Sequence, residues 1–151
     1  MSVGFEAIKN VTINAPMAAV WDALIDPVQV EEYMHGTHLS TDWEVGKPIT
    51  WSGEWQGRTY EDKGTVLVFE PGTTLSYTHW SPMGGTEDKP ENYHTVTYEL
   101  LPVATGTTVT LRQDNNPSAR EARKMADDNW GPVLEGLKTS VEKRVEGRDA
   151  E

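Results

Sequence analysis

The sequence predicts an α+β domain in which an antiparallel sheet precedes a long C-terminal helix. Turn signals recur between residues 39 and 113, two short helical stretches come before them, and an amphipathic stretch follows residue 117. At 151 residues the chain fits one domain, which can bury about two-thirds of its unfolded surface. We therefore expect a single domain over residues 1–151, with a frayed charged tail over residues 146–151.

The N-terminal part predicts one strand followed by two short helices. The strand runs from about Phe5 to Ile13. Pro16 suits the first turn of a helix, because its missing N–H would be unpaired there in any case. Pro27 ends this helix, and residues 28–36 form a further helical turn closed by a glycine. The apolar face of the first helix carries Val20, Leu24 and either Met17 or Trp21.

Residues 49–66 predict a hairpin whose two-residue turn is Gln56 and Gly57. This turn fixes three cross-strand pairs: Trp55 with Arg58, Gly53 with Tyr60, and Trp51 with Asp62. The inner face then collects Ile49, Trp51, Trp55, Tyr60, Gly64 and Val66. Arg58 and Asp62 come inward with this face. The sequence does not determine which face of the sheet each residue beyond Val66 occupies, because the next residues are apolar on both sides and admit a bulge.

A second hairpin is predicted across the Pro/Gly-rich loop that follows residue 80. Alternation places Leu75, Tyr77 and His79 on the core face, together with His94, Val96, Tyr98 and Leu100. Pairing through the loop sets His79 opposite His94. Three alternatives remain for the imidazoles: they fix the hairpin by bonding each other or the backbone, they contact a ligand, or they hold a metal with Asp62.

The last element predicted is a long helix that begins near Ser118. Ser118 and Glu121 have the spacing of a capping box. Pro132 removes one backbone hydrogen bond, so we expect a kink or short break between residues 127 and 131. Trp130, next to this break, is a candidate for the mouth of a cavity. The apolar stripe comprises Ala122, Met125, Ala126, Trp130, Val133, Leu134, Leu137 and Val141.

Composition narrows the function classes. The chain has no cysteine, which excludes disulfides and thiol chemistry, and its N-terminus has no apolar run typical of a signal peptide, so we expect a cytoplasmic protein. A net charge of −11 disfavours nucleic acid and anionic membrane as partners. Six Trp and five Tyr against two Phe favour a cavity lined by aromatic rings with polar atoms. No nucleotide-binding or hydrolase motif is present.

Four segments together resemble a known superfamily: INAPMAAVWDALIDP, KGTVLVFEPGTTLSYTHW, GTTVTLRQDN and NWGPVLEGLKTSVEK. In order and spacing they resemble the helix-grip (SRPBCC) superfamily of START, polyketide cyclase and Bet v 1 proteins. They are most similar to the branch named after the C-terminal domain of the activator of Hsp90 ATPase. The resemblance covers residues 8–143. It implies a curved sheet around the C-terminal helix, with an internal cavity between them.

The resemblance does not name an activity, because members of such a superfamily share a fold with a cavity and differ in the molecules that they bind or convert. We expect a binding protein for a small apolar or aromatic ligand, without a cofactor or metal, as a monomer or homodimer. The alternatives are a polyketide cyclase-like or hydrolase-like enzyme using His79, His94 and Asp62, and a stress-related or Hsp90-type chaperone-interacting module. The expected ligand-binding residues are Trp51, Trp55, Tyr60, Asp62, Tyr77, His79, His94, Tyr98 and Trp130.

Overall fold

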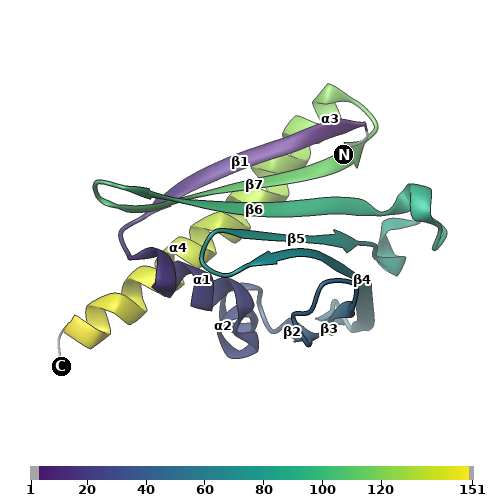
Figure 1. Ribbon diagram of the computed structural model, residues 1–151. Helices are drawn as coiled ribbons and strands as arrows, with labels where there is room; N and C mark the ends of the chain where they lie inside the picture. Colours follow the sequence, from purple (N-terminus) through teal and green to yellow (C-terminus); the bar gives the residue numbers. More distant parts are fainter. Residues whose placement is uncertain (1–3, 150–151) are drawn as a thin grey trace.

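The computed structural model describes residues 4–149 and has the predicted α+β architecture. Seven antiparallel strands form one curved sheet in the order β1-β7-β6-β5-β4-β3-β2 (Figure 1). The strands are β1 (Phe5–Ile13), β2 (His38–Thr41), β3 (Pro48–Trp55), β4 (Arg58–Glu70), β5 (Thr74–His79), β6 (His94–Val103) and β7 (Gly106–Asn116). The strand expected at the N-terminus is thereby confirmed.

Helices cover one face of this sheet. After β1 come α1 (Met17–Ile25) and α2 (Pro27–Tyr33), and the chain closes with α3 (Ala119–Lys124) and α4 (Gly131–Asp149). Figure 1 shows α3 and α4 as one diagonal run across the sheet, with α1 and α2 at its C-terminal half. Both α1 and α2 contact α4, and α3 and α4 contact β1. Helix α4 ends at residue 149, so the described part of the expected tail, residues 146–149, is helical in this structure. Residues 150 and 151 lie outside the described part.

The core lies between the sheet and the helical layer. Leu134, Leu137 and Val141 of α4 are almost completely buried, as the apolar stripe predicts. They belong to one hydrophobic cluster with Val20 of α1 and the inward side chains of the central strands. This cluster fixes the helical run against the sheet.

Both predicted hairpin registers are confirmed. Gln56 and Gly57 have φ angles of 50° and 78°, as a two-residue hairpin turn with two left-handed residues requires. In this hairpin Trp51 pairs with Asp62, and in the second hairpin His79 pairs with His94. The register therefore brings residues from distant segments to the same face of the sheet.

A bulge interrupts β4 in the apolar run for which the sequence does not determine the facing of each residue. The register shifts between Val66 and Val68, which leaves Leu67 as the extra residue. Beyond the bulge Phe69 turns to the core face, where its ring lies 5.4 Å from Trp21 and 5.6 Å from Trp43. Strict alternation from Val66 would have placed Phe69 outside.

The C-terminal helical run contains a π-helical segment in place of the expected break. Residues Met125–Trp130 are π-helical, and the N–H of Gly131 donates to the carbonyl of Ala126, five residues earlier. The wider turn directly before Pro132 accommodates the proline, which has no N–H and would crowd a regular α-helical turn. The helix therefore continues through this point. At its start the Ser118 side chain accepts from the N–H of Glu121, which confirms the cap.

Candidate functional site

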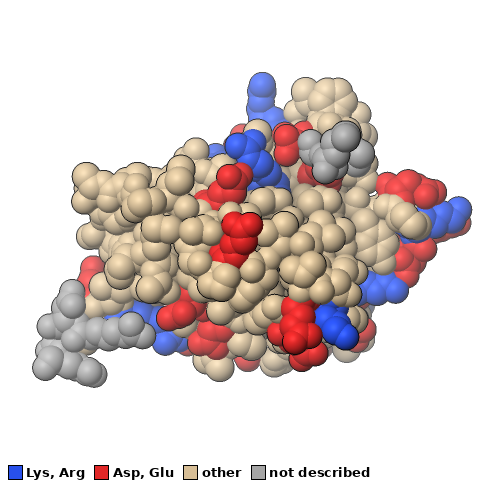
Figure 2. All heavy atoms as spheres, viewed as in Figure 1, with Lys and Arg blue, Asp and Glu red and all other residues tan. Residues whose placement is uncertain are grey.

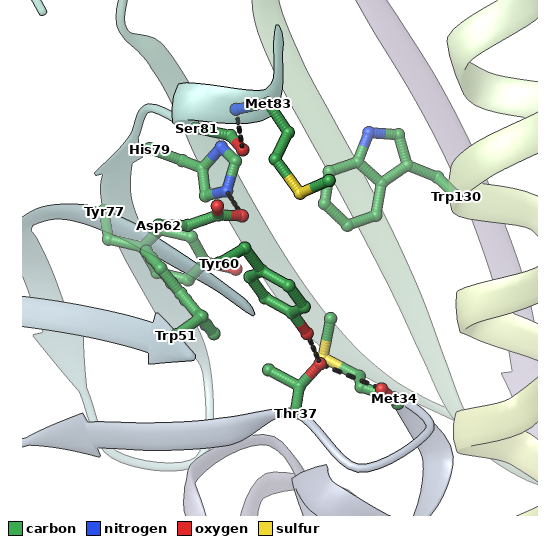
Figure 3. Close-up of a pocket in the computed structure, with 10 residues that line it drawn as sticks. All are labelled: Met34, Thr37, Trp51, Tyr60, Asp62, Tyr77, His79, Ser81, Met83 and Trp130. Atoms are coloured by element: carbon green, nitrogen blue, oxygen red, sulfur yellow. Dashed lines mark hydrogen bonds and ion pairs between the residues drawn. The ribbon is translucent and has the colours of Figure 1, made fainter. Parts of the chain in front are cut away.

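A cavity of about 280 Å³ lies between the inner face of the sheet and the π-helical segment (Figure 3). We call it the main cavity. The strands contribute Trp51, Tyr60, Asp62, Tyr77 and His79 to its lining. The α2–β2 connection, the loop after β5 and the helix contribute Met34, Thr37, Ser81, Met83 and Trp130. Most of these side chains are aromatic rings or thioethers, so the lining is mainly apolar.

A second cavity of about 560 Å³ adjoins the main one. The two share five lining residues: Met34, Asp62, His79, Ser81 and Trp130. The second cavity extends toward the end of β7 and the loop after β5, and it includes His94, Gln113 and Asn115. It therefore adds polar side chains beside the main cavity.

Asp62 and His79 form a polar pair on the strand side of the main cavity. The Nε2 atom of His79 lies 2.9 Å from Oδ2 of Asp62, and their side chains are 29% and 18% exposed. The other carboxylate oxygen, Oδ1, is buried and has no hydrogen-bond partner among the described residues. The exposed part of the Asp62 side chain is therefore Oδ2 and its carbon atoms. No Lys or Arg is among the described residues that line either cavity.

A close approach of β4 to β5 places this pair. Lys63 and Trp80 exchange two backbone hydrogen bonds, whereas the N–H of Thr65 is satisfied by the hydroxyl of Thr78. Gly64 lies between them, and a Cβ atom at this position would be 1.7 Å from the Thr78 carbonyl oxygen. A residue without a side chain is thus required for the strands to hold Asp62 and His79 at hydrogen-bonding distance.

Aromatic rings pack behind the polar pair. The Trp51 ring lies 4.9 Å from Tyr77 and 5.1 Å, edge to face, from His79. Tyr77 continues to Tyr98, which lies deeper in the core and does not line the main cavity. Burial raises the pKa of Tyr98 to about 12, and burial also raises the pKa of Tyr77 well above its usual range. Both phenols therefore stay neutral at physiological pH.

The lower side of the main cavity is closed by a short hydrogen-bond chain. The Thr37 hydroxyl donates to the carbonyl of Met34 at 2.9 Å, and it lies 2.7 Å from the hydroxyl of Tyr60. Because Thr37 has only one hydroxyl proton, Tyr60 is the donor in this second bond. The Tyr60 oxygen then offers lone pairs, but no proton, to any molecule in the cavity.

On the opposite side, Trp130 is held at the cavity by a buried glutamine. Its indole N–H donates to Oε1 of Gln113 at 2.8 Å. Met83, from the short 3₁₀ turn Pro82–Gly84, extends toward this ring in Figure 3. The helix and the loop thus meet over the cavity.

The loop that carries Met83 is tied back to the sheet through Asp88. The Tyr93 hydroxyl donates to Asp88 at 2.6 Å, and the Lys63 ammonium bonds the same carboxylate. The hydrogen bond from Lys63 holds the pKa of the Asp88 carboxyl below its usual range. The indole N–H of Trp80 donates to the hydroxyl of Thr86 in the same loop.

The structure gathers some of the predicted site residues and separates others. Trp51, Tyr60, Asp62, Tyr77, His79 and Trp130 line the main cavity together. His94 lines only the second cavity, where its Nδ1 atom lies 2.8 Å from the Asp114 carbonyl oxygen. Arg58, expected to point inward, is exposed and lines neither cavity, because it directly follows the hairpin turn at Gln56 and Gly57. The Trp55 side chain lies outside the described part.

Four lining residues were not anticipated from the sequence: Met34, Thr37, Ser81 and Met83. The segment that contains Met34 and Thr37 was predicted only as a helical turn, and nothing in its pattern indicates where that turn packs. Ser81 and Met83 lie in the irregular loop after β5, where alternation no longer assigns a face. The glutamine that positions Trp130 was also missed, although its place one alternation step from Leu111 on β7 puts it on the inner face.

The described part of the chain shows no arrangement for a metal ion or a membrane span. No group of three or more described His, Asp or Glu side chains is placed to hold a metal ion. None of the described helices is both long and apolar enough to cross a bilayer. On the face shown in Figure 2, Lys and Arg side chains are interspersed with Asp and Glu and form no basic patch.

A curved antiparallel sheet, a long C-terminal helix and a lined cavity between them define a protein of the helix-grip class. Residues 14–142 match the family model of the Activator of Hsp90 ATPase homolog 1-like protein, and the chain belongs to this family. The match covers the cavity as well as most of the sheet and helix.

Solved structures agree with this assignment. The chain is similar to the solution structure of ChR145 from Cytophaga hutchinsonii, with 45% identity, coverage of 97% of this chain and 99% of that chain, and a TM-score of 0.82. MLL2253 from Mesorhizobium loti is 27% identical, with coverage of 92% and 98% and a TM-score of 0.73. DynU16, described as a putative protein in the dynemicin biosynthetic locus, shares the fold at 21% identity, with coverage of 91% and 47% and a TM-score of 0.74. No curated protein matches the chain.

Proposed function

We propose that the protein binds a small apolar or aromatic molecule in the main cavity. The observation that carries this proposal is the composition of the lining: aromatic and thioether side chains surround a few polar groups, of which Asp62 and His79 form a hydrogen-bonded pair. Small-molecule pockets are typically apolar, with a few polar groups that orient the ligand. A cavity of about 280 Å³ with an adjoining space of about 560 Å³ gives room for such a molecule.

Each side of the cavity has a separate part in this proposal. Trp51 and Tyr77 offer ring surface on the sheet side, and Trp130 offers a third ring from the helix. Because Gln113 occupies the indole N–H of Trp130, this ring presents mainly its apolar surface to a ligand. Asp62 and His79 then fix the orientation of whatever polar group the ligand carries.

Native mass spectrometry of the freshly purified protein tests this proposal. We expect a co-purifying small molecule that is lost when the cavity is filled by Met34→Trp. Leu101→Trp, which adds the same ring to an exposed position of β6, should retain the molecule. An unoccupied mass, together with no change in melting temperature on adding aromatic compounds, would contradict the proposal.

A second candidate function, acid–base catalysis of a cyclase-like or hydrolase-like reaction, is favoured by one observation. The carboxylate of Asp62 holds the imidazole of His79 at 2.9 Å beside the cavity, as a group that orients a general base would. If His79 acts as a base, His79→Gln should lower turnover by about 10²- to 10⁴-fold, a much larger effect than on ligand affinity. Recovery of the co-purified molecule unchanged after long incubation with fresh protein would speak against catalysis.

The family name points to a chaperone-related interaction, which is a third reading of this chain. It concerns the protein surface rather than the cavity. No feature of the described surface favours it over ligand binding, and it stays a prediction.

A further inference from the structure

The charges around the main cavity indicate which chemical class of ligand it takes. Among the described residues that line it, Asp62 is the only acidic side chain, and the other ionisable groups are His79 and the phenols of Tyr60 and Tyr77. No Lys or Arg is among the described lining residues of this or the adjoining cavity. An anionic ligand would therefore have no permanent cation to pair with, and it would meet a carboxylate.

The carboxylate of Asp62 is incompletely paired. A carboxylate has about four acceptor positions, and only Oδ2 has a partner among the described residues, the Nε2 atom of His79. A neutral imidazole that donates through Nε2 leaves the negative charge uncompensated. Since a largely buried carboxylate without compensation is unfavourable, a cation entering the cavity gains both a hydrogen bond and an ion pair.

The other groups around the cavity favour the same kind of ligand. The Tyr60 oxygen is an acceptor only, because its proton is donated to Thr37. The lining donors include the Ser81 hydroxyl, the Trp51 indole and the Tyr77 phenol, all of which are neutral. Aromatic faces attract organic cations through their quadrupoles, and most strongly where water is excluded.

We propose that the main cavity selects an organic cation: a protonated amine joined to a planar apolar body, with the ammonium group on Asp62 and the body between Trp51 and Trp130. The inference rests on the ligand-binding function proposed above and specifies it. The net charge of −11 favours the approach of such a cation but does not select its shape. Selection comes from the single carboxylate and the rings around it.

The test compares ligands of one shape and different charge. The full chain is titrated calorimetrically with 2-naphthylmethylamine, 2-naphthalenemethanol and 2-naphthoate, which are a cation, a neutral molecule and an anion on the same ring system. Methylamine, which has the charge but no ring, measures attraction by net charge alone. We expect the naphthyl amine to bind at least about 10-fold more tightly than the alcohol, because its hydrogen bond to Asp62 is charge-assisted. The naphthoate and methylamine should bind more weakly than the alcohol.

A pair of variants assigns this preference to Asp62. Asp62→Asn should weaken binding of the amine by about 10- to 100-fold and change binding of the alcohol by less than about 3-fold. Glu61→Gln removes the same charge from the neighbouring residue, which is exposed and lines neither cavity, and it should leave both affinities unchanged. The charge series on the unmodified chain decides the question even if Asp62→Asn is unfolded.

The outcomes separate this inference from the proposed function. Equal binding of amine and alcohol, tighter binding of naphthoate, or amine binding that Asp62→Asn does not weaken would overturn the cation preference and leave ligand binding in place. If none of the three naphthyl compounds binds, both the inference and the ligand-binding function are contradicted.

Discussion

His79 and His94 lie directly opposite each other on β5 and β6, yet their imidazoles bond different partners. The Nε2 atom of His79 is 2.9 Å from the Asp62 carboxylate, and the Nδ1 atom of His94 is 2.8 Å from the Asp114 carbonyl. The two rings thus share a register position but belong to separate hydrogen-bond systems. His79 lies at the main cavity, whereas His94 bonds the backbone near the end of β7 and lines the second cavity.

Separate partners predict separate responses to mutation. Asp62→Asn should change the imidazole nitrogen shifts of His79, because the carboxylate no longer fixes the proton on Nε2, and should leave those of His94 unchanged. Long-range ¹H–¹⁵N NMR spectra of the imidazoles measure this directly. Glu61→Gln is the control and should change neither ring. Equal shifts of both histidines in Asp62→Asn would show that the two systems are coupled.

The close approach at Gly64 predicts a large loss of stability on Gly64→Ala. The added Cβ would lie 1.7 Å from the Thr78 carbonyl oxygen, so β4 and β5 must separate and the free energy of unfolding should fall by at least about 3 kcal/mol. Gly147→Ala in α4 has no heavy atom within 4 Å of the new Cβ, and it should be neutral or stabilise by up to about 1 kcal/mol. Urea denaturation measures both. Similar effects of the two substitutions would refute the close approach.

The bond between Trp130 and Gln113 predicts a further stability difference. Trp130→Phe leaves the buried Oε1 of Gln113 without its donor, which should cost about 1 to 3 kcal/mol, including the desolvation of the unpaired group. Trp80→Phe removes an exposed bond to Thr86 and should cost less than about 1 kcal/mol. In the double variant Trp130→Phe/Gln113→Leu, part of the loss should be recovered. No recovery would mean that Trp130 contributes through ring packing alone.

Burial of Tyr98 predicts a loss of stability at alkaline pH. Its pKa is raised to about 12 from 10.0, so between these values the unfolded chain releases a proton that the folded chain retains. The stability contributed by the neutral phenol is therefore complete below pH 10 and is lost as the pH rises toward 12, by about 3 kcal/mol in total. Urea midpoints measured across this range should fall less steeply in Tyr98→Phe. An unchanged slope would place the buried titration elsewhere.

The sequence predicts well which face of the sheet a side chain occupies, but it predicts poorly how deeply that side chain is buried. Alternation correctly places Tyr77 and Tyr98 on the inner face, and hairpin chemistry correctly opposes Trp51 and Asp62. Tyr98 nevertheless lies in the packed core, because its depth depends on which helix covers that part of the strand. Period-two patterns contain no information on this tertiary packing.

Irregular backbone accounts for the remaining differences between the fold that the sequence predicts and the structure. The bulge that turns Phe69 inward could be suspected from a run of apolar residues but not located. Pro132 correctly marks a disturbance in the helix, yet either a break or a π-helical turn could accommodate it, and packing of Trp130 on the sheet accompanies the π-helical turn. Met34 and Met83 reach the cavity from connections whose positions depend on the assembled fold.

Intermolecular nuclear Overhauser effects with bound 2-naphthylmethylamine test the central claim, ligand binding in the main cavity, most directly. We predict contacts from the naphthyl protons to the methyl groups of Met34 and Met83 and to the indole ring of Trp130, which face the main cavity from three different elements. Contacts confined to exposed residues of β6 such as Leu101 and Val103, or no contacts at saturating amine, would contradict the account.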